Sequence, residues 1–288
     1  ASLESSVGNS KNTSMVVAML NNASRIALLA WTFQSILVVL LAQGVSGRSI
    51  HQAGPTLVML HPMNSNGEGF RRDLETQAED TFVASLNAAG VRVIFPDAPL
   101  GICPPEFTRC WHTKPWRDMP QLPEDDEPTE SMASTYSSVV GPLLTELSRT
   151  VGLENVIVAG YSMGATMAAQ LIHLAPPGLA GVAVVKGNLY AGSPFWKPLL
   201  EAGPKAPQVL LTAGTHDHVI LVDNVWNTAK RMRVAGVRVT VRMNEKDHYL
   251  NHADAEVLRD WVLSVFDRRV PPTPSAGNPL MTCMCPPV

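Results

Sequence analysis

The chain has 288 residues, which suits one large domain or two small ones. Hydrophobic residues make up 45% of it and charged residues 16%, a composition that excludes a disordered chain and predicts a sizeable buried core. The formal net charge is -3, and no basic run or aromatic-interleaved basic stripe occurs, so no nucleic-acid partner is expected.

The N-terminal part carries an apolar run without charged residues at 26–42 (IALLAWTFQSILVVLLA). The run is slightly long for the hydrophobic region of a signal peptide and slightly short for a comfortable membrane span. A cleaved signal, a signal anchor and an amphipathic helix packed on the domain all remain open. We therefore treat residues 1–50 as a hydrophobic targeting or anchor segment. A signal or anchor would bring secretory-pathway entry or membrane association through residues 26–42, and otherwise the location would be cytoplasmic.

After residue 50, short apolar runs alternate with longer amphipathic segments. The apolar runs predict strands at 56–61, 91–95, 155–160, 181–185, 208–212 and 237–243. The amphipathic segments predict helices at 76–89, 131–151, 163–174, 222–234 and 253–268. Strands that are apolar at nearly every position are typical of a sheet buried on both faces, and their alternation with helices predicts βαβ units. We therefore predict an α/β domain over residues 51–270, with a mostly parallel central sheet and helices on both faces.

Two segments interrupt this alternation. The connection at 96–130 is rich in proline, acidic residues and tryptophan, and loops of this length inside a domain are usually functional or disordered. It contains Cys103 and Cys110, which would pair in an oxidising compartment and would otherwise be isolated thiols. Residues 271–288 are rich in proline and predict an extended C-terminal tail.

The pattern Gly-x-Ser-x-Gly occurs at 160–164 (GYSMG), directly after a predicted apolar strand and directly before a predicted helix. In that context a sharp turn exposes the serine hydroxyl at the carboxyl edge of the sheet, and the glycines leave room for the turn. The helix N-terminus behind the serine favours the negative charge that develops in acyl transfer. Ser162 is therefore predicted to be a nucleophile, the alternative being a glycine-serine turn without function.

A serine hydroxyl needs a general base, and on this architecture the chain order is Ser, acid, His. His248 lies between the last predicted strand and the last predicted helix, in a loop that opens at the same sheet edge as Ser162. His252 falls at the start of that helix, where a capping or surface role is more common. We therefore predict His248 as the base.

The acid that orients the base is expected at the end of a strand. Asp217 follows the strand at 208–212 within the sequence GTHDH. Its competitors are Asp223, which falls inside the next helical pattern, and Asp247, which is adjacent to His248. We predict that Asp217 is the acid.

No metal site is predicted. His216 and His218 flank the predicted acid, but no further ligand cluster accompanies them, so we interpret them as polar neighbours. The cysteines occur in two close pairs without zinc-ligand spacing.

The oxyanion of acyl transfer needs two backbone N–H donors. Met163, the residue after the nucleophile, would supply one, and the loop after an early strand would supply the other. That loop begins at 61–69 (HPMNSNGEG), where Pro62 has no N–H to donate and Met63 does. We therefore predict Met63 and Met163 as the donors.

Several motifs agree with one known family. They are LH at 60–61, glycines at 67 and 69, FPDAP at 95–99, WRD at 116–118, GYSMG at 160–164, GTHD at 214–217 and the histidine at 248. From Thr56 to Phe266 the chain resembles the carboxylesterase/phospholipase family of α/β-hydrolases, which includes the acyl-protein thioesterases. The resemblance implies an α/β-hydrolase fold without a large lid domain, esterase or thioesterase activity, and no metal or organic cofactor. Pro62 and Met163 depart from the usual family pattern.

The expected function is hydrolysis of a carboxylic ester or thioester through an acyl-enzyme, on a small-molecule or lipid-acyl substrate or an acylated protein. We take His61, Trp116 and Tyr161 as candidates for the substrate pocket. A non-catalytic binding module on the same fold and a peptidase with the same triad are the alternatives.

Overall fold

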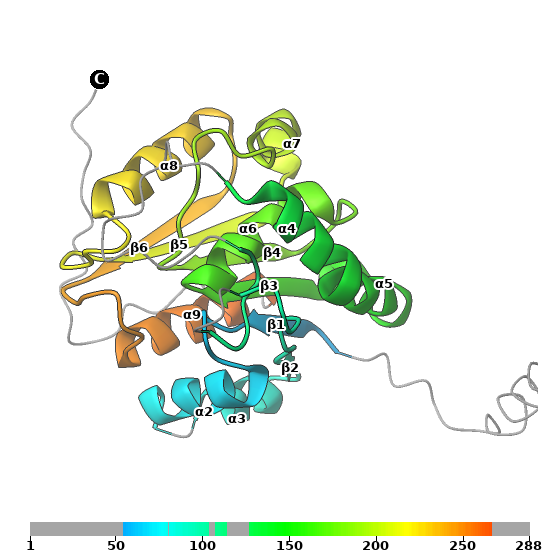
Figure 1. Cartoon of the computed structure of the whole chain (residues 1–288), viewed down its shortest axis with the longest axis vertical. Coiled ribbons are helices and arrows are strands. Elements are labelled where there is room, and N and C mark those ends of the chain that lie inside the picture. Colours follow the sequence, from blue (N-terminus) through cyan, green and yellow to red (C-terminus); the bar gives the residue numbers. More distant parts are fainter. Residues whose placement is uncertain (1–53, 80, 104–106, 114–126, 267–288) are drawn as a thin grey trace, which may run out of the picture. The chain divides into compact units, whose positions relative to one another are not determined.

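The computed structural model describes residues 54–79, 81–103, 107–113 and 127–266 (Figure 1). The apolar run at 26–42 and the tail at 271–288 lie outside these residues. None of the helices in the described part of the chain is long and apolar enough to cross a membrane.

The centre of the domain is a six-stranded sheet in which every neighbouring pair of strands is parallel. Its strands are β1 (Thr56–Leu60), β2 (Arg92–Ile94), β3 (Val156–Tyr161), β4 (Gly181–Val185), β5 (Gln208–Gly214) and β6 (Val239–Asn244). The order in the sheet is β2-β1-β3-β4-β5-β6. The chain therefore leaves β1 in one direction and returns on its other side, so β1 and β3 flank a topological switch point. Open α/β sheets bind ligands at the carboxyl ends of their strands beside such a point.

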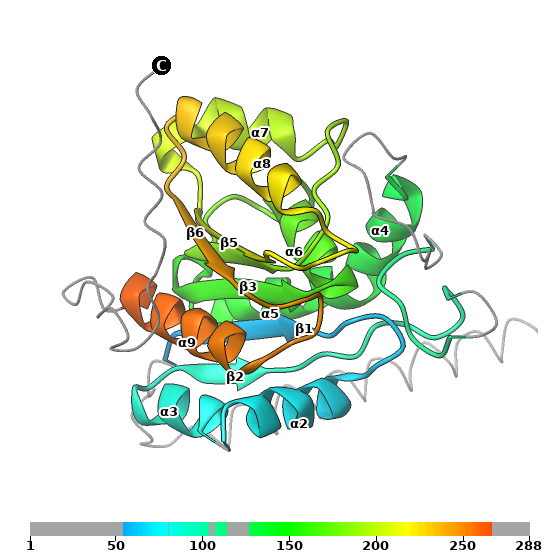
Figure 2. The same cartoon turned by 90° about the vertical axis from the view of Figure 1, so that its left-hand side faces the viewer.

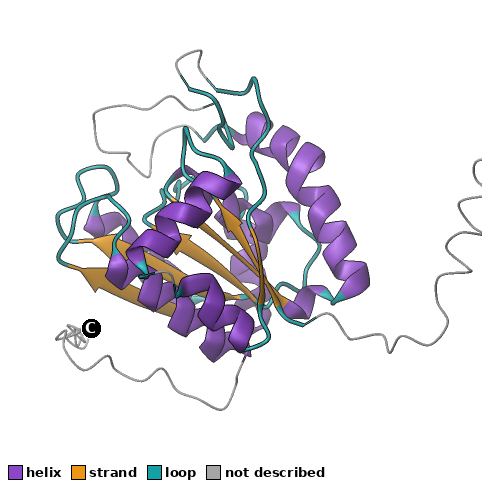
Figure 3. Cartoon of the chain, turned by 90° about the horizontal axis from the view of Figure 1, so that it is seen from below, coloured by secondary structure: helices purple, strands orange, loops and turns teal. Residues whose placement is uncertain are grey.

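Helices cover both faces of the sheet, as Figures 1, 2 and 3 show. One face carries α2 (Gly67–Gln77), α3 (Phe82–Ala88) and α9 (His252–Phe266). The other carries α4 (Thr129–Thr135), α5 (Gly141–Thr150), α6 (Met163–Leu174), α7 (Trp196–Ala202) and α8 (Val222–Val234).

The strands separate two hydrophobic cores because successive side chains point to opposite faces. In β1, Leu57 and Met59 join the core under α2, α3 and α9. Val58 and Leu60 join the core under the other five helices. All four are almost completely buried, which explains why the strand is apolar at every position. The prediction of an α/β domain with helices on both faces of its sheet is confirmed, and the described sheet is wholly parallel.

The structure corrects the helix predictions at two places. The segment predicted as one helix at 76–89 contains the end of α2 and all of α3, and α2 begins at Gly67, where the Asn66 side chain accepts a hydrogen bond from the Gly69 N–H at 2.7 Å. Helix α2 is mostly polar, and only two large apolar side chains, Phe70 and Leu74, mark it in the sequence. Helix α7 was not predicted, because it is short.

The predicted long helix at 131–151 is observed as α4, a π-helical turn at Tyr136–Val140 and α5 in direct succession. Short 3-10 turns at Leu153–Asn155 and Gly203–Lys205 lead into β3 and β5.

Candidate active site

Ser162 lies in the sharp turn between β3 and α6, with φ 54° and ψ -119°. This left-handed conformation is rare for a residue with a side chain, and such strain is typical of functional sites. The Ser162 N–H donates to the carbonyl of Val185, at the end of β4, at 3.0 Å. The turn is thus anchored to the neighbouring strand.

The two glycines of the turn permit close backbone packing. A Cβ at Gly160 would lie 2.2 Å from the carbonyl of Gly164. A Cβ at Gly164 would lie 2.2 Å from the carbonyl oxygen of Leu60 and 2.5 Å from that of His61. The first turn of α6 therefore packs directly on the loop after β1, which brings the segments containing Met163 and Met63 together.

We expect Gly164→Ala to lower the free energy of unfolding by about 3 kcal/mol, because backbone rather than a flexible side chain would have to move. Gly192→Ala is the matched control, since a Cβ there meets no atom within 4 Å, and it should change stability by less than about 0.5 kcal/mol. Urea unfolding of both variants measures the difference. Equal stability of the two would contradict this account of the turn.

Ser162, His248 and Asp217 form a continuous chain of hydrogen bonds. Ser162 Oγ lies 2.9 Å from His248 Nε2, and His248 Nδ1 lies 2.9 Å from Asp217 Oδ2. A carboxylate only accepts, so Nδ1 carries the proton and Nε2 is left to accept from the serine hydroxyl. This is the arrangement that lets an imidazole remove a proton from serine.

Asp217 is held on its other side by the backbone. Its Oδ1 accepts hydrogen bonds from the N–H groups of Val219 and Ile220, both at 2.8 Å. Burial raises the pKa of Asp217, but the hydrogen bond and charge of His248 and the two backbone donors outweigh it, so the pKa lies below its ordinary value. The carboxylate is therefore ionised at neutral pH.

The competing polar residues lie elsewhere or make other contacts. Asp223 is exposed in the first turn of α8, and Asp247 accepts a hydrogen bond from the Tyr249 N–H at 3.0 Å. His252 Nδ1 donates to the carbonyl of Gln77 at 2.8 Å, a surface role. Across the described ranges, no group of three or more His, Cys, Asp or Glu side chains is arranged to hold a metal.

Tyr161, a pocket candidate, contacts the loop that carries His248. Its hydroxyl donates to the backbone carbonyl of His248 at 2.7 Å, and its ring stacks with that of His248 and with that of Phe70. Burial raises the pKa of Tyr161, so the hydroxyl remains a donor. These contacts favour a role in holding the loop.

His61, another pocket candidate, is the first residue after β1 and is fully buried. Its Nε2 accepts from the Ala98 N–H at 3.0 Å, so its Nδ1 carries the proton and donates to the Pro62 carbonyl at 2.7 Å. Burial lowers the pKa of His61 and keeps the ring neutral. The Pro62 carbonyl and the Met63 N–H belong to one planar trans peptide and point in opposite directions. The hydrogen bond from His61 to that carbonyl therefore also fixes the direction of the Met63 N–H. These contacts favour a role in shaping the loop after β1.

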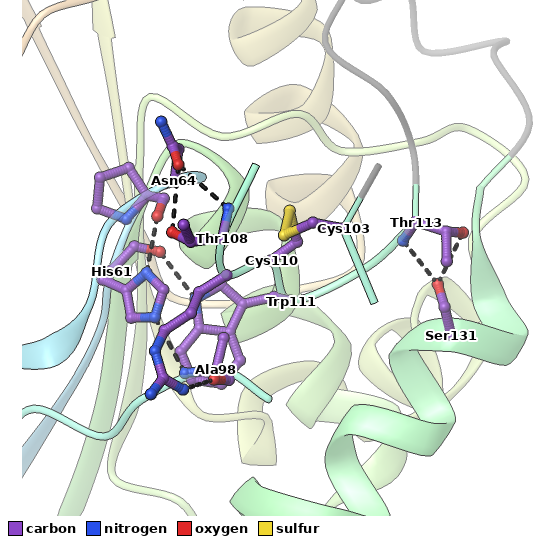
Figure 4. Close-up of a disulfide and its surroundings, with 11 residues drawn as sticks. His61, Asn64, Ala98, Cys103, Thr108, Cys110, Trp111, Thr113 and Ser131 are labelled. Carbon is purple, nitrogen blue, oxygen red and sulfur yellow. Dashed lines mark hydrogen bonds between the residues drawn. A yellow bond between two sulfur atoms is a disulfide. The ribbon is translucent and has the colours of Figure 1, made fainter. Parts of the chain in front are cut away.

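Residues beside a disulfide hold the loop after β1 in place (Figure 4). Cys103 and Cys110 are joined by a disulfide, one of the two alternatives left open by the sequence. The Asn64 N–H donates to the Arg109 carbonyl at 3.0 Å, and the Trp111 indole N–H donates to the His61 carbonyl at 2.8 Å.

Sequence reasoning missed the bracing role of Trp111, for which its position directly after Cys110 was the only signal. The third pocket candidate, Trp116, lies outside the described residues.

Comparison with known proteins identifies the family of the chain. The alpha/beta hydrolase family model matches residues 57–286, and the chain belongs to that family. It is similar to lysophospholipase-like protein 1 of Mus musculus, with 25% identity over 226 residues that cover 76% of this chain and 90% of that protein. It is also similar to carboxylesterase SOBER1 of Arabidopsis thaliana, with 23% identity over 210 residues, covering 72% and 88%.

Solved structures share the fold. The crystal structure of Arabidopsis thaliana SOBER1 superposes with a TM-score of 0.55 at 19% identity, covering 74% of this chain and 99% of that one. The crystal structure of Zea mays acyl-protein thioesterase 2 superposes with a TM-score of 0.55 at 21% identity, covering 77% and 97%. The protein is thus an α/β hydrolase that is similar in sequence to a lysophospholipase-like protein and a carboxylesterase.

Proposed function

We propose that the protein is a serine hydrolase that cleaves carboxylic esters or thioesters through an acyl-enzyme. The observation that carries this proposal is the hydrogen-bonded chain from Ser162 Oγ through His248 to Asp217. The strained turn at Ser162 and the names of the relatives support it.

In the acylation step, Ser162 Oγ bonds to the substrate carbonyl carbon while its proton passes to His248 Nε2. Asp217 stabilises the imidazolium and keeps its Nδ1 proton in place. The backbone N–H groups of Met63 and Met163 donate to the oxyanion of the tetrahedral intermediate. When that intermediate collapses, the bond to the leaving oxygen or sulfur breaks, and His248 returns its proton to the leaving group.

In the deacylation step, His248 takes a proton from water, and the hydroxide oxygen bonds to the acyl carbon. The bond to Ser162 Oγ breaks, His248 returns the proton to that oxygen, and the free acid leaves. The reaction uses no group beyond the chain's own residues and water. The substrate class we propose is a small-molecule or lipid-acyl ester or thioester, or an acylated protein.

The test compares an oxygen ester and a thioester that carry the same acyl group, in water with added methanol. Methanol competes with water for the acyl-enzyme and gives a methyl ester in place of the free acid. Both substrates pass through the same acyl-enzyme, so we expect the same ratio of methyl ester to free acid from each. Chromatography of the products gives the ratio. A ratio that depends on the leaving group, or absence of turnover across a series of acyl chain lengths, would overturn the proposal and favour a binding module.

A further inference from the structure

A buried lysine lies directly after β4, beside the nucleophile turn. The Lys186 side chain has no exposed surface, and its ammonium lies 2.6 Å from Asp254 Oδ2, on the first turn of α9. The same ammonium donates to the backbone carbonyl of Tyr249 at 2.7 Å. Its backbone has φ 50°, a conformation unusual for a residue with a side chain. A buried ion pair is weak evidence for stability, so this one calls for another explanation.

Asp254 joins both ends of the loop that carries His248. Its Oδ1 accepts from the Asn244 side-chain amide at 2.7 Å, at the end of β6. Its Oδ2 accepts from the Asn251 side-chain amide at 2.7 Å, just before α9. Burial raises the pKa of Asp254, and the Lys186 ammonium counteracts that effect.

Two adjacent carbonyls of this loop are therefore held by side chains from neighbouring strands. The Tyr161 hydroxyl holds the His248 carbonyl from the end of β3, and the Lys186 ammonium holds the Tyr249 carbonyl from the end of β4. The register pairs Tyr161 with Val185, so Lys186 leaves the sheet one residue beyond the level of Tyr161. Tyr249 as a whole is 76% exposed, so the loop is fixed there through its backbone carbonyl.

We propose that Lys186 is a positioning residue for His248: it holds the Tyr249 carbonyl and, through Asp254, closes the loop that presents the imidazole to Ser162. This inference rests on the proposed function. The Lys186 ammonium bonds to the Tyr249 carbonyl and to Asp254, so it affects the rate through the position of the His248 imidazole. A displacement of about 1 Å at a catalytic group lowers a rate by about a hundredfold.

The test uses Lys186→Met, the double variant Lys186→Met/Asp254→Asn and the control Lys230→Met, whose lysine is exposed on α8. The double variant leaves no unpaired buried charge, so it remains informative if the single variant does not fold. For folded protein we expect kcat for a p-nitrophenyl ester to fall between about tenfold and a hundredfold, with KM changed by less than about twofold. The control should match the wild type. An unchanged kcat per folded molecule, with only a lower melting temperature, would overturn the proposal.

A second readout separates this inference from the proposed function. The low-field proton resonance of the His248 Nδ1–H, which faces Asp217, should shift or broaden in the Lys186 variants and stay in place in Lys230→Met. If the wild type lacked Ser162-dependent turnover, the proposed function would fail. The resonance would still show whether Lys186 positions His248, because its measurement does not depend on turnover. An unchanged resonance in the folded double variant would overturn the positioning role.

Discussion

Ser162→Ala is expected to abolish covalent labelling by a fluorophosphonate probe and to lower kcat for p-nitrophenyl esters by about 10⁶-fold. The reason is that Oγ is the atom that bonds to the acyl carbon, and it is the group that lies 2.9 Å from His248 Nε2. Loss of one small hydroxyl leaves the turn, its backbone bond to Val185 and the two glycines unchanged, so the variant should stay folded.

The matched control is Ser137→Ala, which removes an exposed serine hydroxyl in the π-helical turn between α4 and α5. It should label and turn over like the wild type. Gel fluorescence quantifies labelling, and mass spectrometry of the digested protein should place the adduct on Ser162. Labelling that persists in folded Ser162→Ala would remove this residue from the mechanism. Absence of labelling in the folded wild type would mean that the hydroxyl is not activated.

Asp217→Asn is expected to lower kcat by about 10⁴-fold while changing KM little. The two backbone N–H groups of Val219 and Ile220 require an acceptor at the Oδ1 position, so the amide oxygen will occupy it. The amide nitrogen then faces His248 Nδ1, which must become the acceptor. The ring proton moves to Nε2, where it faces Ser162 and blocks removal of the hydroxyl proton.

The control for this variant is Asp223→Asn, which makes the same chemical change at an exposed site in α8 and should leave kcat unchanged. Steady-state kinetics of both variants measure the split between kcat and KM. A fall confined to KM, or equal effects of the two substitutions, would contradict the role of Asp217 as the residue that orients His248.

Local patterns in the sequence determined most of the strands and helices of the domain. Strands such as β3 and β4 lie between two packed faces and so are apolar at each position, which makes them visible without knowledge of their neighbours. Helix α6 was predicted with the observed bounds because the Gly-x-Ser-x-Gly turn marks its start. The candidates Ser162, Asp217 and His248 could be named because each follows a strand, and parallel strands all end at one edge.

Only the tertiary structure decided how that edge is held together. Lys186 and Asp254 are 68 residues apart, and nothing in either local pattern indicates that they pair. Their contact follows from the register of β3 and β4 and from the return of α9 across the sheet. The buried orientation of His61 likewise depends on the Ala98 N–H, 37 residues away. Periodicity records which face of an element is buried, whereas hydrogen bonds between distant segments depend on strand order and register. The sequence by itself therefore determined the fold class and the chemical candidates, and the tertiary structure decided which groups position them.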